Sequence, residues 1–120
     1  QRNHNLIEIF QKFISFLIAM SVWLLEGLTS YIISFSIGYP ISLHIIFLAV
    51  SLGNISKVIP VTPGGLGIYE ATVILLMGIF GIPASVATLL SILDHVLKTL
   101  LGMLFGAFSL IFQPAFKIER

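Results

Sequence analysis

Two long apolar runs, residues 13–37 and 84–112, constrain the fold of this chain more than any other feature. A helix rises about 1.5 Å per residue, so each run is long enough to cross the roughly 30 Å hydrocarbon core of a bilayer. Hydrophobic residues make up 58% of the 120 residues and charged residues only 9%, which is too little charge to cover a soluble domain. Backbone polar groups in lipid must be satisfied within the protein, so the sequence predicts an all-α, polytopic integral membrane bundle.

Charge and cysteine content exclude several classes of protein. The formal net charge is only +1, which leaves no basic face for nucleic acid, so we expect no nucleic-acid partner. The chain has no cysteine, which excludes disulfides and thiolate chemistry. Because the composition is strongly apolar, we expect membrane lipids as partners.

The apolar pattern divides the chain into a short lead-in and four helices. Residues 1–12 are polar with apolar positions at helical spacing, which fits either an amphipathic helix at the headgroups or an extension of the next helix. The third helix covers only about 21 Å, too short for a comfortable crossing. The expected helices are residues 13–37, 41–58, 67–80 and 84–112.

The segment between the second and third helices interrupts the apolar pattern. Its prolines and glycines cannot continue a helix, so backbone groups are freed from helical hydrogen bonds. At membrane depth such a break is tolerated only where protein or a water-lined cavity satisfies those groups. Either all four helices cross, or the second and third form a re-entrant hairpin, which the short third helix favours. The interrupted run is Ile59-Pro60-Val61-Thr62-Pro63-Gly64-Gly65-Leu66-Gly67-Ile68-Tyr69-Glu70.

Positive charges near the helix ends predict the orientation. Lys and Arg are more frequent on the cytoplasmic than on the external flanks of membrane helices. Both ends of this segment are therefore expected in the cytoplasm, in a multi-pass protein of the cell membrane. The flanking residues are Arg2, Lys12, Lys117 and Arg120.

Polar residues within the predicted spans form one group of candidates. Each ionisable one costs on the order of 2.5–3.5 kcal/mol to insert, so each requires a partner or a function. When Lys57 and Glu70 beside the break are counted, the group holds three carboxylates and two lysines, so the charges nearly cancel. Protonation of His95 would bring the net charge of the group to zero. Lys98 is expected near Glu26 by depth, and it follows Asp94 at i, i+4 in the favourable order. The group forms either a polar path or structural glue between helices, and it comprises Glu26, Ser91, Asp94, His95 and Lys98.

The break also offers an anion site. The third helix begins there with unpaired N–H groups, which make its N-terminus partly positive. Discontinuous membrane helices hold anionic groups at such ends, and glycines let a phosphate approach the backbone closely. Lys57 would add a full positive charge, whereas Glu70 in the first turn also fits a capping role. No Gly-Lys-Ser/Thr follows, so the run is not a nucleotide loop. The candidate headgroup-binding residues are Lys57, Thr62, Pro63, Gly64, Gly65, Gly67 and Glu70.

No catalytic centre is expected in this chain. An enzyme would need a nucleophile or a metal cluster, and cysteine is absent. Asp94 and His95 are adjacent rather than at metal-ligand spacing on one helical face. We therefore expect no metal, no cofactor and no catalytic activity from this chain by itself.

A family resemblance rests on these same residues. From residue 13 onward the chain resembles the lysylphosphatidylglycerol synthase transmembrane-region family of flippase-like membrane proteins, most specifically in the Pro-Gly-Gly-x-Gly-x-x-Glu signature. The resemblance implies that residues 13–120 are the C-terminal part of a larger domain that handles polar lipids, with further N-terminal helices and, often, a soluble transferase domain as partners. Family sequences often carry Arg where this chain has His95, which implies a titratable group instead of a permanent charge. The matching residues are Ile59-Pro60-x-Thr62-Pro63-Gly64-Gly65-Leu66-Gly67-Ile68-Tyr69-Glu70-Ala71 and Gly81-Ile82-Pro83.

Three functions are compatible with these features. The leading hypothesis is membrane-embedded translocation or handling of a polar lipid headgroup that is anionic, aminoacylated or glycosylated. The first alternative is a lipid-acceptor-binding or accessory membrane domain of a transferase. The second is a scaffold for a soluble partner, in which the intramembrane charges only hold helices together.

Overall fold

The computed structural model describes residues 1–113, and every regular element in that range is helical. This confirms the all-α prediction. Lys117 and Arg120, which contribute to the predicted orientation, lie outside the described residues. In chain order the elements are α1 (Arg2–Ser36), α2 (Leu43–Ser56), the short 3-10 helix η1 (Pro63–Gly65), α3 (Ile68–Ile79) and α4 (Ala84–Phe112).

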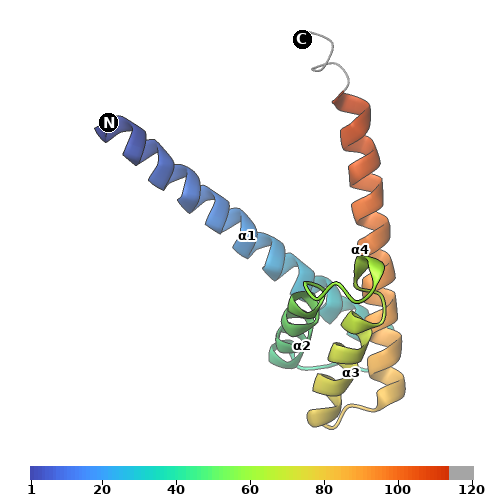
Figure 1. Ribbon diagram of the computed structural model, residues 1–120. Helices are drawn as coiled ribbons and strands as arrows, with labels where there is room; N and C mark the ends of the chain where they lie inside the picture. Colours follow the sequence, from blue (N-terminus) through green and yellow to red (C-terminus); the bar gives the residue numbers. More distant parts are fainter. Residues whose placement is uncertain (114–120) are drawn as a thin grey trace.

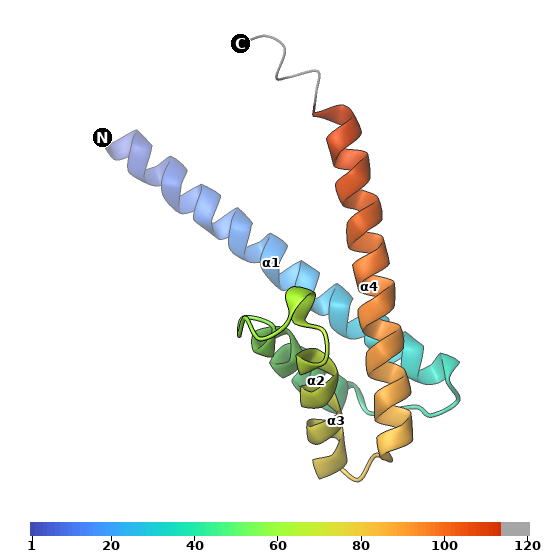
Figure 2. The same cartoon turned by 45° about the vertical axis from the view of Figure 1, so that its right-hand side comes forward.

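The two long helices, α1 and α4, are the frame of the molecule. Both are long and apolar enough to cross a membrane, and few residues of either apolar stretch are buried within the bundle. They lie close together near the C-terminal end of α1 and the N-terminal end of α4, and they diverge toward the two chain ends (Figures 1 and 2). Residues 1–12 continue into α1 without a break, so the lead-in and the first predicted helix form one element.

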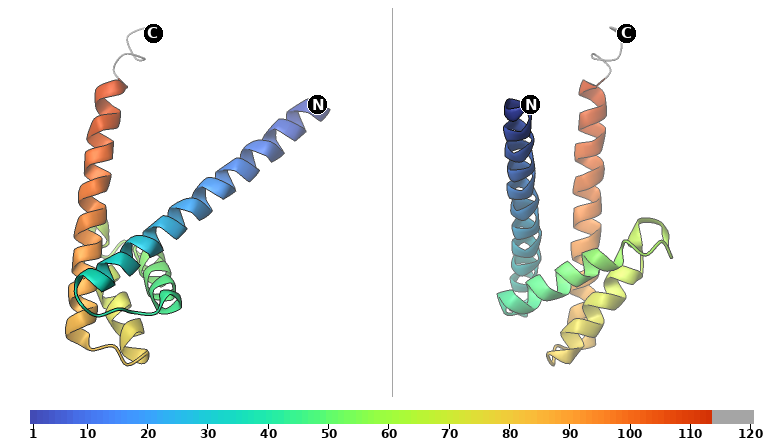
Figure 3. Two further views of the ribbon diagram at one scale, coloured as in Figure 1. Left: turned by 180° about the vertical axis from the view of Figure 1, so that it is seen from behind. Right: turned by 60° about the vertical axis from the view of Figure 1, so that its left-hand side comes forward.

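Helices α2 and α3 form a short antiparallel pair beside this frame. At 14 and 12 residues they are too short to cross a hydrocarbon core of roughly 30 Å. The segment that joins them, residues 57–67, turns back at about the level of the middle of α4 and does not reach the level of the chain ends (Figures 1 and 3). The Pro/Gly break is therefore the tip of a hairpin that runs about half the length of α4.

The core lies at the end of the molecule where α1 and α4 approach each other, and there α2 and α3 pack against each other and against the long helices. Gly27 of α1 allows one of these approaches, because a Cβ there would lie 2.3 Å from the Phe47 ring of α2. The turn before α4 also depends on glycine: Gly81 has φ +81°, and the next amide donates back to Met77 O at 3.0 Å, which ends α3. The buried hydrophobic residues are Ile41, Ile46, Ala49, Val50, Tyr69, Val73, Met77, Ile82, Ala87 and Leu90.

Candidate functional site

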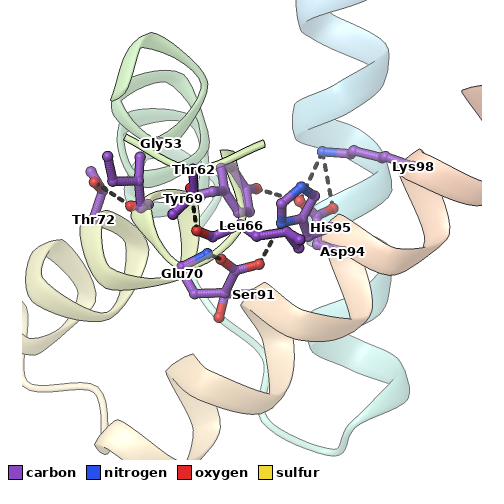
Figure 4. A network of polar contacts seen from close by, with 12 residues as sticks. Gly53, Thr62, Leu66, Tyr69, Glu70, Thr72, Ser91, Asp94, His95 and Lys98 are labelled. Carbon is purple, nitrogen blue, oxygen red and sulfur yellow. Dashed lines mark hydrogen bonds and ion pairs between the residues drawn. The ribbon is translucent and has the colours of Figure 1, made fainter. Parts of the chain in front are cut away.

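Asp94 is the centre of a polar network at the junction of α1, α3 and α4. Its side chain is 1% exposed, although it lies in an apolar helix. It accepts hydrogen bonds from Ser30 Oγ of α1 at 2.6 Å and from the Tyr69 hydroxyl of α3. Lys98 Nζ lies 2.9 Å from Asp94 Oδ1 and 3.2 Å from Ser30 Oγ, and it reaches from α4 toward α1 (Figure 4). The predicted i, i+4 pair of Asp94 and Lys98 is thus formed, and the hydrogen bonds around it connect α1, α3 and α4.

Tyr69 connects this network to the tip of the hairpin. Its side chain is 1% exposed, and Lys57 Nζ lies 4.5 Å from the centre of its ring, a cation–π contact. Gly53 of α2 lets the ring pack closely, because a Cβ at that position would lie 2.7 Å from it. One aromatic side chain therefore links Lys57 to the carboxylate of Asp94.

A second pair of ionisable groups lies one residue further along α3 and α4. The Glu70 carboxylate of α3 contacts His95 Nδ1 of α4 through Oε1. Through Oε2 it accepts a hydrogen bond of 2.8 Å from the Gly67 N–H, which caps the start of α3. Glu70 thus has the capping role considered from the sequence, and it also brings a negative charge to the helix end where an anionic headgroup was predicted.

The tip of the hairpin is held by its own backbone and by two side chains. Gly64, Gly65 and Gly67 all have positive φ, at 68°, 71° and 84°, a conformation that other residues rarely adopt. The Thr62 hydroxyl donates to Leu66 O at 2.5 Å, and Pro63 begins η1. Gly65 is buried against the Lys57 side chain, whose Cγ would lie 2.5 Å from a Cβ. Four of the candidate binding residues, Thr62, Pro63, Gly64 and Gly67, are exposed.

Glu26 takes a different partner from the one expected. Its Oε2 accepts a hydrogen bond of 2.7 Å from the Asn54 amide of α2. In the described part of the chain Lys98 forms its ion pair with Asp94, and Glu70 contacts His95, so Glu26 and Lys98 are not directly paired. Both instead line a cleft of about 510 Å³ between α1 and α4, together with Thr29 and Gly102.

Ser91, the remaining candidate, is fully buried and donates to the Thr88 carbonyl at 3.0 Å, so its hydroxyl is satisfied within α4. Three residues of the network were not singled out from the sequence: Ser30, Asn54 and Tyr69. Ser30 could have been found, because it follows Glu26 by one turn and so lies on the same face of α1. Tyr69 lies in the Pro/Gly run, between the glycines and the Glu70 carboxylate that formed the predicted anion site.

Two further cavities adjoin the hairpin. One of about 670 Å³ lies between α2 and α3 and is lined almost entirely by apolar side chains. The other, of about 300 Å³, lies between α3 and α4 beside the Glu70–His95 pair. Groups of three or more residues suited to hold a metal ion are absent from residues 1–113.

The family model described as the lysylphosphatidylglycerol synthase TM region matches residues 5–106, which include every candidate residue above. The chain belongs to this family. Membership in the lysylphosphatidylglycerol synthase TM region family, together with two candidate spans, identifies a membrane protein.

Two curated relatives are archaeal. The chain is 28% identical over 100 residues to glycosyltransferase AglD of Haloferax volcanii and 26% identical over 96 residues to a UPF0104 membrane protein of Methanothermobacter thermautotrophicus. The alignments cover 79% and 77% of this member of the lysylphosphatidylglycerol synthase TM region family, but only 16% and 29% of the two relatives. No solved structure gives a significant match.

Proposed function

We propose that this chain is part of a membrane-embedded module that binds the polar headgroup of a lipid and moves it between leaflets. In this proposal α1 and α4 cross the bilayer, and α2 and α3 enter it as a re-entrant hairpin. Both ends of the segment face the cytoplasm. The headgroup passes through the cleft between α1 and α4, and its acyl chains stay in the surrounding lipid.

The observation that carries the proposal is the cleft of about 510 Å³ that Glu26 and Lys98 line between two long, largely apolar helices. An ionised group at membrane depth is costly unless it is paired or lines a polar path. The two helices that line the cleft diverge toward the chain ends (Figure 2). A headgroup in this position would find both a carboxylate and an ammonium group within one cavity.

The tip of the hairpin supplies the second element of the proposal. Lys57 is partly exposed, and its ammonium group is held over Tyr69 instead of in an ion pair among the described residues. It can therefore attract an anionic headgroup without first giving up a carboxylate partner. Because Glu70 already caps α3, the attraction depends on Lys57 more than on the helix N-terminus.

The test is a translocation assay with the native protein in vesicles. A fluorescent anionic lipid is placed in both leaflets and a membrane-impermeant reductant is added outside. Wild-type protein should expose the inner-leaflet label to the reductant, whereas Lys57→Met and Gly65→Leu should protect it. Lys12→Met, at an exposed position of α1, is the matched control for charge, and elution as a single species checks folding. Undiminished translocation by folded Lys57→Met protein would contradict the proposal.

A second function is favoured by one observation. A relative aligned over most of this chain is named a glycosyltransferase, and the alignment covers only 16% of its length. The chain would then serve as a lipid-acceptor-binding membrane domain attached to a catalytic domain. In that case Lys57→Met should lower sugar transfer to lipid by the native protein and leave translocation in protein-containing vesicles unchanged.

A further inference from the structure

Lys57 lies at a point of the chain where little else fixes the position of a side chain. It follows the last residue of α2, and the two residues after it, Val58 and Ile59, are 80% and 56% exposed. A positive charge at a helix C-terminus is favoured by the helix dipole, but this attraction does not select one rotamer of a long side chain. A fixed position for the ammonium group therefore requires contacts along the lysine itself.

Such contacts exist at both ends of the Lys57 side chain. A Cβ on Gly65 would lie 2.5 Å from Lys57 Cγ and 3.1 Å from Lys57 Cβ, so the stem packs directly against the glycine. At the other end Nζ lies 4.5 Å from the centre of the Tyr69 ring, within the range of about 6 Å for a cation–π contact. The glycine thus confines the stem, and the ring holds the ammonium group.

Tyr69 can hold an ammonium group in one place because its own ring is enclosed. Its side chain is 1% exposed. A Cβ on Gly53 of α2 would lie 2.7 Å from the ring, the hydroxyl donates to Asp94 of α4, and the centre of the His95 ring lies 5.1 Å from the centre of the Tyr69 ring. Contacts from two helices therefore fix the ring before any ligand arrives.

A neutral ring and a carboxylate leave a lysine in different electrostatic states. A carboxylate cancels the charge, as Asp94 does for Lys98 at 2.9 Å. An aromatic face attracts the cation through its quadrupole and carries no net charge, so the positive charge persists. Among the described residues Lys57 makes no ion pair. An anionic group that approaches the hairpin tip would thus meet an uncancelled charge on a side chain that has already lost its rotamer freedom.

We infer that Tyr69 is a positioning residue for the binding of a phosphate-bearing headgroup at the hairpin tip, and that its ring, not its hydroxyl, has this role. The ring holds the Lys57 ammonium group, and the hydroxyl belongs to the network around Asp94. The choice of ligand rests on the proposed function. The position of Lys57 is measurable without translocation, so failure of this inference and failure of the proposed function are distinguishable.

The experiment measures the acetylation rate of individual lysines by mass spectrometry, with the native protein in phosphatidylcholine nanodiscs. Acetylation consumes the free amine, so the Lys57 ammonium group must leave the ring to react. Tyr69→Leu should raise the rate at Lys57 about five-fold, the effect expected for loss of one cation–π contact, whereas Tyr69→Phe should stay within about two-fold of wild type. Tyr31→Leu, at a partly buried tyrosine of α1, is the matched control, and exposed Lys12 is the internal reference; neither rate should change.

Fluorination of the ring separates its electrostatic role from its packing. Tyr69→Phe variants whose rings carry increasing numbers of fluorine atoms keep nearly the same shape, while the fluorines withdraw negative charge from the aromatic face. The acetylation rate at Lys57 should rise with each fluorine, which a merely structural role of the ring would not produce. This series tests the inference even where Tyr69→Leu protein does not fold.

Protection by a ligand tests whether the positioned lysine is available to an anion. Dihexanoyl phosphatidic acid and inorganic phosphate are the two probes, and the one that protects Lys57 at lower concentration identifies a lipid headgroup or a free anion as the source of the phosphate. Tyr69→Leu should require about five-fold more of that probe than wild type or Tyr69→Phe.

Four results would each overturn the inference: equal acetylation of Lys57 in Tyr69→Leu and wild-type protein, an equal rise in Tyr69→Phe and Tyr69→Leu, a flat fluorine series, or protection by neither probe. Protection that depends on the ring, in protein that moves no lipid between leaflets, would contradict the proposed translocation and support the inference.

Discussion

Removal of the Asp94 carboxylate should destabilise the protein mainly by leaving Lys98 without its counter-charge. Asp94 is 1% exposed, and its partners are Lys98, Ser30 and Tyr69. Loss of one member of a buried ion pair costs roughly 3–5 kcal/mol. The Lys98 side chain is 17% exposed and lines the cleft toward α1, so it can turn toward that space. We therefore expect Asp94→Ala to cost about 3 kcal/mol, the lower end of that range.

The double variant separates this charge effect from loss of packing. Asp94→Ala with Lys98→Met removes both charges and retains the length of the second side chain. Its remaining cost should be about 1–2 kcal/mol, because the hydroxyls of Ser30 and Tyr69 still lose their acceptor. The double variant should thus be more stable than Asp94→Ala alone. The coupling between the two sites should be at least about 2 kcal/mol, because Lys98→Met alone also leaves a buried charge without its partner.

The measurement is equilibrium unfolding of the native protein in mixed micelles, followed by helical circular dichroism as the fraction of denaturing detergent rises. Glu8→Ala and Lys12→Met provide the matched control cycle. These two residues have the same i, i+4 order on α1 but are exposed, so their coupling should stay below about 0.5 kcal/mol. If the effects of Asp94→Ala and Lys98→Met simply add, the central role assigned to this ion pair is refuted.

Two glycine substitutions test the packing around Tyr69 and Lys57. Gly53→Ala should lower the free energy of unfolding by about 2 kcal/mol, because its Cβ would lie 2.7 Å from the Tyr69 ring. The control Gly78→Ala, at a helical position with open space, should be neutral or stabilising by up to about 1 kcal/mol. Equal unfolding midpoints of the two variants in the micelle titration would contradict this. Gly65→Ala should cost about 1–2 kcal/mol because of the positive φ at this position, and it should also displace the Lys57 side chain. The displacement should change the rate at which Lys57 reacts with amine-reactive reagents. An unchanged rate would show that contact with Gly65 does not hold the Lys57 side chain in place.

Much of the fold was predictable because its determinants are local. The length of the apolar runs predicts α1 and α4, and the Pro/Gly run places the break between α2 and α3. In the structure α2 begins at Leu43 and ends at Ser56, so each end lies two residues inside the predicted bounds of 41–58. The positive φ of Gly64 and Gly65, which interrupts helical geometry within η1, follows from no periodicity in the sequence.

The pairing of the polar groups was less predictable because it depends on how each helix is rotated about its axis. Asp94 and Lys98 lie on one helix, and their spacing alone predicts the contact. Glu26 and Lys98 lie on different helices, and depth alone does not fix which face of α1 meets α4. Ser30 donates to Asp94 of α4, whereas Glu26, one turn earlier on the same face of α1, extends toward Asn54 of α2.

We expect the polar groups of α1 and α4 to divide between the two roles considered from the sequence. Asp94 is enclosed by partners from three helices, so structural pairing is sufficient to explain it, and Lys98 is largely committed to it. Glu26 and His95 differ, because each has one atom bound to a fixed partner and lines a cavity. Orientation by a partner that leaves a second atom accessible is what a binding group requires. Substitutions at Glu26 and His95 should therefore alter ligand handling more than stability, and substitutions at Asp94 should do the reverse.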